Sequence, residues 1–345
     1  MRSRRRGLMK VHVKNNRWKP GSFPNTPEGE EVFTITRARL DDALAEYPDL
    51  KGRADYVVDW DTDNFASSMR DADVLLTWDL PMADLATVAP RLKWIHCIGA
   101  GVEHMLPISD WLPKGVVLTN NKGVHAAKAG EFGLMAVLML HSKMPAIVTN
   151  QRNEVYDSLY ASPIAGRTLV VLGTGSLGGA GAQAVQKLGV HVIGVNRSGQ
   201  PVDGCDEVVT TDHLDEVLPR ADYLLIATPD TPQTRGLMDR RRLDLMKPGA
   251  GIINIGREAV MDYDALCDKL QDGSLGGAIL DVFDPEPIAA DSRLWATPNL
   301  IITPHVSADD GDAYVPMTLG LFFRNMRLFL DDQPLLNPVR PELGY

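Results

Sequence analysis

The chain has 345 residues, of which 44% are hydrophobic and 23% charged, a composition typical of a globular protein of about two domains. Its formal net charge of −10 argues against general affinity for nucleic acid or for an anionic membrane. Cys97, Cys205 and Cys267 are far apart and form no CxxC pair. This pattern indicates free thiols in a cytoplasmic protein and predicts neither a disulfide framework nor a metal site.

The first 120 residues alternate short strands with helical segments. The basic stretch MRSRRRGLMK is followed by no apolar run of signal-peptide length, so we expect a solvated tail or a start at Met9. A short strand near 11–13 precedes a Pro-, Gly- and Asn-rich segment, 15–31, that we predict to be a surface loop. Further elements are expected in a helix at 37–46 and in strands at 56–58 and 74–77. The pattern predicts a small α/β domain.

From residue 126 the pattern changes to a long apolar helix, expected over 126–148. Its most apolar run, 132–140, is much shorter than the roughly 20 residues that span a bilayer. Apolar strand-length runs then recur between helical segments, at 168–172, 190–195, 223–227, 251–255, 278–282 and 300–303. This alternation predicts a doubly wound parallel sheet with both faces covered. A last helix, 313–330, lies beyond that sheet and is expected to return to the first domain.

The segment VLGTGSLG carries glycines at the spacing of a dinucleotide-binding turn. Gly173, Gly175 and Gly178 follow an apolar strand and open a helix rich in small residues. The second glycine would let a pyrophosphate approach the backbone, and the helix N-terminus would offer free N–H groups. Three glycines would weaken a purely structural helix. The sequence therefore predicts a bound dinucleotide.

The end of the next strand bears on the choice between NAD and NADP. NAD-binding folds place an acidic residue roughly 20 residues after the first glycine, where it holds the ribose hydroxyls. This chain instead has Asn196, Arg197 and Ser198, followed by a glycine. A guanidinium and a hydroxyl can bind a 2′-phosphate, so NADP is favoured over NAD. The alternative is that these residues only form a turn.

Three further stretches lie at the carboxyl ends of later strands, where open α/β sheets bind their ligands. They are INIGREAV, LDVFDPEP and ITPHVSA, and they contain Arg257, Asp281, Glu286 and His305. Together with LKWIHCIGAGVEH, KAGEFGL and MKPGAGIINIGR, they cover nearly the whole chain. In this set of ordered motifs the sequence resembles the D-isomer-specific 2-hydroxyacid dehydrogenase family.

The resemblance implies an architecture and an activity. A Rossmann dinucleotide domain, residues 124–307, would be inserted into a smaller flavodoxin-like substrate domain made of residues 1–123 and 308–345. It also implies that the chain reduces a 2-keto acid, with Arg257 binding the carboxylate and keto oxygen, Glu286 pairing with His305, and His305 acting as acid/base. Histidine titrates in the range that this proton transfer needs.

The resemblance also assigns contacts to substrate and cofactor. The backbone N–H groups of Ala100 and Gly101 would bind the substrate carboxylate, and Asp281 would meet the nicotinamide carboxamide. The remaining cofactor contacts carried over by position are Ser176, Leu177, Thr228, Pro229, Ile255, His305, Ser307 and Ala308.

Departures from the family pattern affect the expected substrate. Glu258 replaces the glycine that usually follows the catalytic arginine, and an acidic run, 309–312, follows His305. Glu258 would change the local charge around Arg257. The acidic run either is only a solvated helix start or, at the edge of the cleft, disfavours phosphorylated substrates, so small acids such as glyoxylate or hydroxypyruvate are preferred. A phosphoglycerate dehydrogenase-like enzyme and a dinucleotide-sensing corepressor-like protein are the alternatives. The formate-oxidising branch would have Gln in place of Glu286. A homodimer that uses the 126–148 helix is expected by family resemblance.

Overall fold

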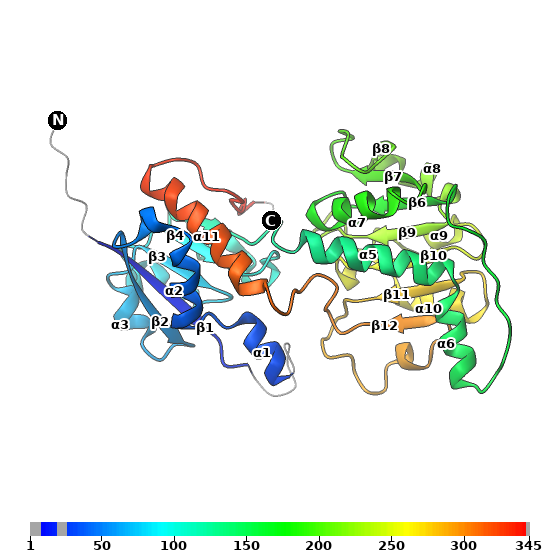
Figure 1. Ribbon diagram of the computed structural model, residues 1–345, viewed down its shortest axis with the longest axis horizontal. Coiled ribbons are helices and arrows are strands. Elements are labelled where there is room, and N and C mark those ends of the chain that lie inside the picture. Colours follow the sequence, from blue (N-terminus) through cyan, green and yellow to red (C-terminus); the bar gives the residue numbers. More distant parts are fainter. Residues whose placement is uncertain (1–7, 19–25, 343–345) are drawn as a thin grey trace. The chain divides into compact units, whose positions relative to one another are not determined.

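The computed structural model describes residues 8–18 and 26–342, so the arginines of the basic N-terminal stretch lie outside the described residues. The chain forms two compact units (Figure 1). Unit 1 combines Met1–Val124 with Asp310–Tyr345, and unit 2 is His125–Asp309. These boundaries fall one and two positions after those of the sequence-based division, which lie after residues 123 and 307.

Unit 1 is built on a parallel sheet with strand order β2-β1-β3-β4-β5, which is the order of flavodoxin-like folds. Its strands are β1 (Met9–Asn15), β2 (Ala54–Trp60), β3 (Val74–Thr77), β4 (Trp94–Cys97) and β5 (Val117–Thr119). Its helices are α1 (Pro27–Phe33), α2 (Arg37–Ala45), α3 (Phe65–Met69), α4 (Leu85–Val88) and α11 (Tyr314–Leu330).

The C-terminal helix α11 completes the core of unit 1. Phe322 of α11 stacks on Trp94 of β4 with ring centroids 4.9 Å apart, in a cluster that also contains Val11 and Val13. The side chains of Leu75, Ile95 and Leu118 point to the opposite face of the sheet and pack in a second cluster there. The last helix therefore belongs to the same unit as the first 124 residues, although almost 200 residues separate them.

Unit 2 contains a seven-stranded sheet with the order β12-β11-β10-β9-β6-β7-β8, in which every strand pair is parallel. The strands are β6 (Thr168–Leu172), β7 (His191–Asn196), β8 (Glu207–Thr210), β9 (Tyr223–Ile226), β10 (Gly251–Asn254), β11 (Gly277–Leu280) and β12 (Leu300–Ile302). The helices are α5 (Ala126–His141), α6 (Met144–Arg152), α7 (Ser176–Gln186), α8 (Leu214–Val217), α9 (Arg240–Asp244) and α10 (Tyr263–Gln271). The order confirms the predicted doubly wound fold.

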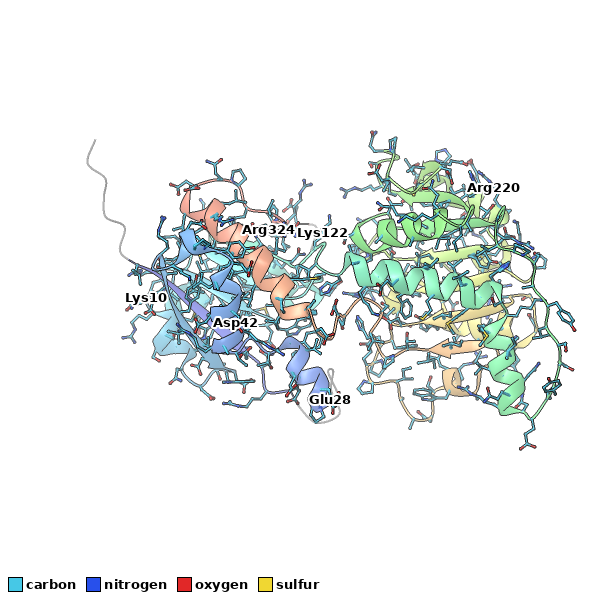
Figure 2. All side chains as sticks on the ribbon, viewed as in Figure 1. Lys10, Glu28, Asp42, Lys122, Arg220 and Arg324 are labelled. Carbon is cyan, nitrogen blue, oxygen red and sulfur yellow. The ribbon has the colours of Figure 1, made fainter. Side chains whose placement is uncertain are left out.

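Both faces of this sheet are buried, as the continuous apolar strands predict. Successive residues of β6 point to opposite faces, so Leu169 packs with α5 and α7 while Val170 packs with α9 and α10. Helices α5 and α7 lie side by side (Figure 1), and a Cβ on Gly133 would come within 3.2 Å of the Cα of Gly181. Charged side chains lie on the outside, for example Arg220 (Figure 2), which pairs with Glu207 at 2.7 Å.

Two sequence-based predictions of helices are wrong in detail. The expected helix over 126–148 is broken into α5 and α6, which meet at 66°. Lys143 takes a left-handed conformation at the break, and Pro145 supplies no backbone donor for a continuing helix. The segment 15–31, expected to be a loop, contains the start of α1, where Thr26 caps the helix by accepting from the Gly29 N–H.

In the described part of the chain, no single helix is long and apolar enough to cross a membrane. Only α5 and α6 taken together, as a bent pair, reach that length and composition. Helix α5 packs within unit 2, against α7 and the sheet.

Candidate active site

The carboxyl ends of the unit 2 strands bring the predicted residues to one edge of the sheet. Gly173 directly follows β6, Asn196 ends β7, and Thr228 lies two positions beyond the end of β9. The loops after β10, β11 and β12 carry Arg257, Asp281, Glu286 and His305. Parallel strands thus gather residues that are more than 130 positions apart in the sequence.

The three positions of the turn after β6 hold glycine for different physical reasons. Gly173 has φ +95°, and a Cβ there would lie 2.7 Å from the Thr228 Cγ2. A Cβ on Gly178 would lie 2.0 Å from the Gly173 carbonyl oxygen, which no side chain permits. Gly175, by contrast, has nothing within 4 Å of its Cβ position, directly before the N-terminus of α7. The fold requires the first and third glycines, and the second leaves room for a phosphate.

In the turn after β7, Asn196 has the structural role that the turn reading of its sequence gives it. The Asn196 amide donates to the Thr174 hydroxyl at 2.9 Å, and its Oδ1 accepts the N–H groups of Ser198 and Gly199 at 3.0 and 2.7 Å. Asn196 therefore shapes the turn and ties it to the glycine turn. Arg197 and Ser198 are exposed beside it.

The loop after β9 contains a polar atom that the protein does not satisfy. The Thr228 hydroxyl is buried and has no hydrogen-bond partner among the described residues. Pro229 is exposed, and Ile255, directly after β10, is buried. A buried hydroxyl without a partner is costly unless a ligand completes it. With the open space at Gly175, it fits a dinucleotide lying along this edge.

Glu286 and His305 form the central contact of the site. The His305 Nδ1 lies 2.8 Å from the Glu286 Oε2, while the Glu286 Oε1 accepts the Phe283 N–H at 2.8 Å. Burial by itself would lower the pKa of His305, but the hydrogen bond and negative charge of Glu286 outweigh it, and the pKa is raised. The pair keeps a proton available on the imidazole, whose Nε2 is the ring nitrogen not bound to Glu286.

Arg257 lies close enough to His305 for its positive charge to act on the imidazole. This charge opposes protonation and offsets a part of the increase in the His305 pKa that Glu286 causes. The Arg257 Nη1 donates to the Gly256 carbonyl at 2.7 Å, and the side chain is half-buried. A Cβ on Gly256 would lie 2.6 Å from the Thr228 carbonyl oxygen. The strand end that carries Arg257 is thus packed directly against the loop after β9.

Asp281 has a structural contact that sequence reasoning missed. The carboxylate is fully buried, and it accepts from the Thr303 hydroxyl at 2.6 Å and from the N–H groups of Val306 and Ser307 at 2.9 and 3.0 Å. These bonds clamp the loop that presents His305, which has a left-handed backbone with φ 54°. Because Asp281 and the residues it binds are more than 20 positions apart, local sequence patterns cannot predict these hydrogen bonds. The expected contact between Asp281 and a nicotinamide carboxamide stays a prediction.

The two departures from the family pattern have different surroundings. Burial and the charge of Asp284 raise the pKa of Glu258, which lines a cavity of about 300 Å³ together with Asp264 and Asp284. Burial also raises the pKa of Asp309 to about 6, although the charge of His305 opposes this. Of the two readings of the acidic run, a solvated helix start or an edge of the site, this interaction with His305 favours the second for Asp309.

The rest of the predicted set has simpler surroundings. Ser176 and Leu177 begin α7, Ser307 is buried in the clamped loop, and Ala308 is half-buried. Ala100 and Gly101 belong to unit 1, where they follow β4 at the carboxyl edge of its sheet. Within residues 8–18 and 26–342, no group of three or more His, Cys, Asp or Glu side chains has the arrangement of a metal site.

Comparison with known proteins identifies the class to which this fold and site belong. The family model for the NAD-binding domain of the D-isomer specific 2-hydroxyacid dehydrogenases matches residues 134–307. The chain belongs to this family, whose members are NAD(P)-dependent dehydrogenases.

Individual relatives agree with this class. A D-isomer specific 2-hydroxyacid dehydrogenase from Xanthobacter autotrophicus Py2, solved with NADPH, is 26% identical with a TM-score of 0.80, covering 98% of this chain and 99% of its own. An NADPH-dependent glyoxylate/hydroxypyruvate reductase from Sinorhizobium meliloti, solved with NADP and sulfate, is 27% identical with a TM-score of 0.77, covering 98% and 100%.

Curated relatives include two kinds of enzyme. Glyoxylate/hydroxypyruvate reductase A from Serratia proteamaculans is 31% identical over 69% of this chain and 78% of its own length. D-3-phosphoglycerate dehydrogenase from Mycobacterium bovis is 30% identical over 73% of this chain, but the match spans only 48% of that protein. The family is therefore established, and the substrate within it is a separate question.

The Glu286–His305 contact makes a prediction about pH. Since the negative charge of Glu286 raises the pKa of His305, Glu286→Gln should lower that pKa. An acid catalyst works below its pKa and loses its proton as the pH rises through it. The variant should therefore lose kcat for keto-acid reduction at lower pH than the wild type does. The check is a pH profile of kcat, with the exposed Glu216→Gln as control, and an unmoved profile would contradict the pairing.

Proposed function

We propose that this dehydrogenase uses NADPH to reduce a small 2-keto acid, of the glyoxylate or hydroxypyruvate type, to the D-2-hydroxy acid. The observation that carries the proposal is the 2.8 Å contact between Glu286 and His305, with the raised pKa of the imidazole, at the strand edge that also holds Arg257. The glyoxylate/hydroxypyruvate reductases among the relatives support the substrate class.

The roles of the residues follow from charge and geometry. The reduced nicotinamide, when bound, supplies a hydride to the keto carbon. Arg257 binds the substrate carboxylate and stabilises negative charge that develops on the keto oxygen. His305 gives its Nε2 proton to that oxygen, which completes the hydroxyl, and solvent then returns a proton to the imidazole. Glu286 keeps the imidazole oriented and protonated before each turnover.

Asn196, Arg197 and Ser198 support NADPH over NADH. The turn carries a guanidinium and a hydroxyl but no carboxylate that would repel a 2′-phosphate. Arg197→Ala should lower kcat/KM for NADPH by about tenfold, which corresponds to about 1.4 kcal/mol, and leave the value for NADH unchanged. The check is steady-state kinetics with both cofactors, using the exposed Arg152→Ala as control. An unaltered NADPH to NADH ratio would overturn the assignment of Arg197.

The substrate is tested with a panel of glyoxylate, hydroxypyruvate, pyruvate, bulkier keto acids and 3-phosphohydroxypyruvate. We expect glyoxylate and hydroxypyruvate to give the highest kcat/KM of the panel. Preference for the phosphorylated acid would favour the phosphoglycerate dehydrogenase-like alternative, since such an enzyme is among the relatives. Stoichiometric NADPH binding without oxidation over the whole panel would favour a dinucleotide-sensing binding protein.

We also propose that the protein is a cytoplasmic homodimer that pairs through α5 and the segment after α6. Met135 and Leu138, three positions apart on α5, are 43% and 37% exposed, and Tyr156 and Tyr160 are 100% and 82% exposed. Light scattering should give twice the chain mass of 37.8 kDa. Tyr156→Glu should shift it toward one chain. A wild-type mass of one chain at micromolar protein would contradict the dimer.

The proposed cytoplasmic location is supported by the cysteines, since the three free thiols suit a reducing compartment.

A further inference from the structure

In unit 1, the loop after β4 is held by its carbonyl groups over three consecutive residues. The Ile98 carbonyl accepts from the Asn121 amide at 2.5 Å and from the Tyr314 hydroxyl at 2.7 Å. The Gly99 carbonyl accepts the Asn121 backbone N–H at 2.9 Å. The Ala100 carbonyl accepts from the side-chain amide of Asn120 at 2.8 Å. Two adjacent asparagines and one tyrosine of α11 thus fix every carbonyl of this short stretch.

The N–H groups on the same stretch are in a different situation. Within the part of the chain that the structure describes, those of Ala100 and Gly101 donate to no protein acceptor. Both residues are half-buried. A loop in which three successive carbonyls are satisfied by the protein and two N–H groups are left over is suited to bind an anion.

We propose that Asn121 is a positioning residue for recognition of the substrate carboxylate: it sets the backbone of Ile98–Gly99–Ala100 so that the N–H groups of Ala100 and Gly101 can bind that carboxylate. The proposal rests on the proposed reduction of a 2-keto acid. Asn121 acts through the backbone and does not itself touch the substrate.

The amide of Asn121 is oriented by a hydrogen-bond chain with only one consistent direction. Burial lowers the pKa of His96 to about 4, so its ring is neutral and carries one N–H. The Trp94 indole can only donate, and it gives its N–H to the Thr119 hydroxyl at 2.8 Å. That hydroxyl lies 2.8 Å from the His96 Nδ1, and the His96 Nε2 lies 3.1 Å from the Asn121 Oδ1. The chain therefore runs from indole to hydroxyl, to Nδ1, and from Nε2–H to the amide oxygen.

With the oxygen of Asn121 taken by His96, its NH₂ group must serve the other side. One N–H goes to Ile98, and the other goes to the Thr318 hydroxyl of α11 at 2.6 Å. Asn121, Thr318, His96 and Thr119 are all fully buried. This buried network has one arrangement, because reversing the Asn121 amide would turn its oxygen toward the Ile98 carbonyl, which can also only accept.

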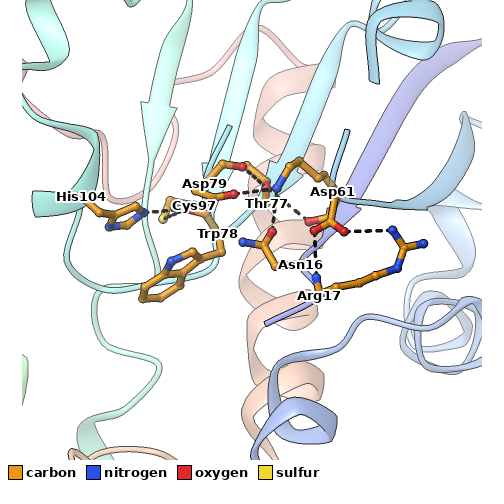
Figure 3. Close-up of polar contacts among 9 residues, drawn as sticks. Asn16, Arg17, Asp61, Thr77, Trp78, Asp79, Cys97 and His104 are labelled. Carbon is orange, nitrogen blue, oxygen red and sulfur yellow. Dashed lines mark hydrogen bonds and ion pairs between the residues drawn. The ribbon is translucent and has the colours of Figure 1, made fainter. Parts of the chain in front are cut away.

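The other side of the loop is closed by Trp78. A Cβ on Gly99 would lie 2.7 Å from the Trp78 ring, so no larger residue fits there. Trp78 is itself fixed: its ring stacks on His104 with centroids 4.7 Å apart, and its carbonyl accepts from the His104 Nε2 at 2.8 Å and from the Cys97 thiol at 3.4 Å (Figure 3). The loop is thus clamped between a polar network and an aromatic ring.

The experiment compares two buried members of one network. Asn121→Leu removes the donor to the loop, whereas Thr318→Val removes only the second acceptor of the same amide and touches no loop carbonyl. With saturating NADPH, Asn121→Leu should raise KM for the keto acid by about tenfold or more while kcat and the Kd of NADPH change less than twofold. Thr318→Val should leave KM within twofold of wild type, although both variants lower Tm. The Kd of oxamate, an unreactive carboxylate, should follow KM.

Tyr314→Phe keeps the proposal testable if Asn121→Leu does not fold. It removes one of the two donors to the Ile98 carbonyl and should raise KM about threefold, with kcat unchanged. KM values that follow Tm alike in all three variants would show a merely structural role and overturn the proposal. A wild-type protein that turns over no keto acid would instead overturn the proposed function, so the two failures are distinguishable.

Discussion

Replacing His305 by asparagine should lower kcat for keto-acid reduction by about 10²–10⁴-fold, because the reaction loses its positioned proton donor. Asparagine is the best substitution, since His305 has φ 54° and asparagine tolerates the left-handed conformation better than most residues. The fold and the glycine turn should be unaffected. The Kd of NADPH, measured by fluorescence titration, should therefore stay within a few-fold of wild type.

His191→Asn is the matched control for this variant. His191 lies half-buried at the start of β7 in the same unit, beside Asp206 and Glu207, and so resembles His305 in having a carboxylate partner. It lies at the opposite end of a strand from the candidate site. Equal losses of kcat in the two variants, or a fully active His305→Asn, would remove His305 from the acid role.

Arg257→Gln should lower kcat/KM for the keto acid by about 10²–10³-fold, since the group that binds the carboxylate and stabilises charge on the keto oxygen is lost. Arg257→Lys keeps the charge but loses the forked geometry of the guanidinium, so its loss should be intermediate. Loss of the cation that opposes protonation should also raise the pKa of His305. The pH limit of activity should then move upward, opposite to the effect of Glu286→Gln.

Arg235→Gln is the control for loss of positive charge in this region. Arg235 is 67% exposed and pairs with Asp230, in the loop after β9, and its charge influences the pKa of Glu258 next to Arg257. Its replacement should change kcat/KM by less than about threefold, because an exposed ion pair contributes little. An Arg257→Gln variant with the kinetics of this control would contradict a role in substrate binding.

Local sequence patterns predicted what depends on neighbours in the chain. The glycines of the turn after β6, the apolar strands of unit 2 and the residues at their carboxyl ends all have signals within about ten positions. The fold class follows from these signals, as does the placing of Arg257, Glu286 and His305 on one sheet edge, because parallel strands end together.

Contacts between distant segments were not predictable in this way. Asp281 binds the loop of His305 as far as Ser307, which is 26 positions away in the sequence. Asn121 and Thr318 are 197 positions apart. A buried carboxylate or amide has the same sequence signature whether it binds a ligand or its own chain. Asp310, in the acidic run, accepts the N–H groups of Asp312 and Ala313 and so shapes the turn before α11.

Transfer of deuterium tests the central claim most directly. NADPH labelled with deuterium at C4 of the nicotinamide, in separate samples for each face of the ring, is incubated with hydroxypyruvate, and the product is analysed by mass spectrometry and chiral chromatography. The account predicts D-glycerate with one deuterium at C2 from one of the two labels, and almost none from His305→Asn. Tight binding of NADPH without deuterium in any product, for hydroxypyruvate, glyoxylate and pyruvate alike, would contradict it.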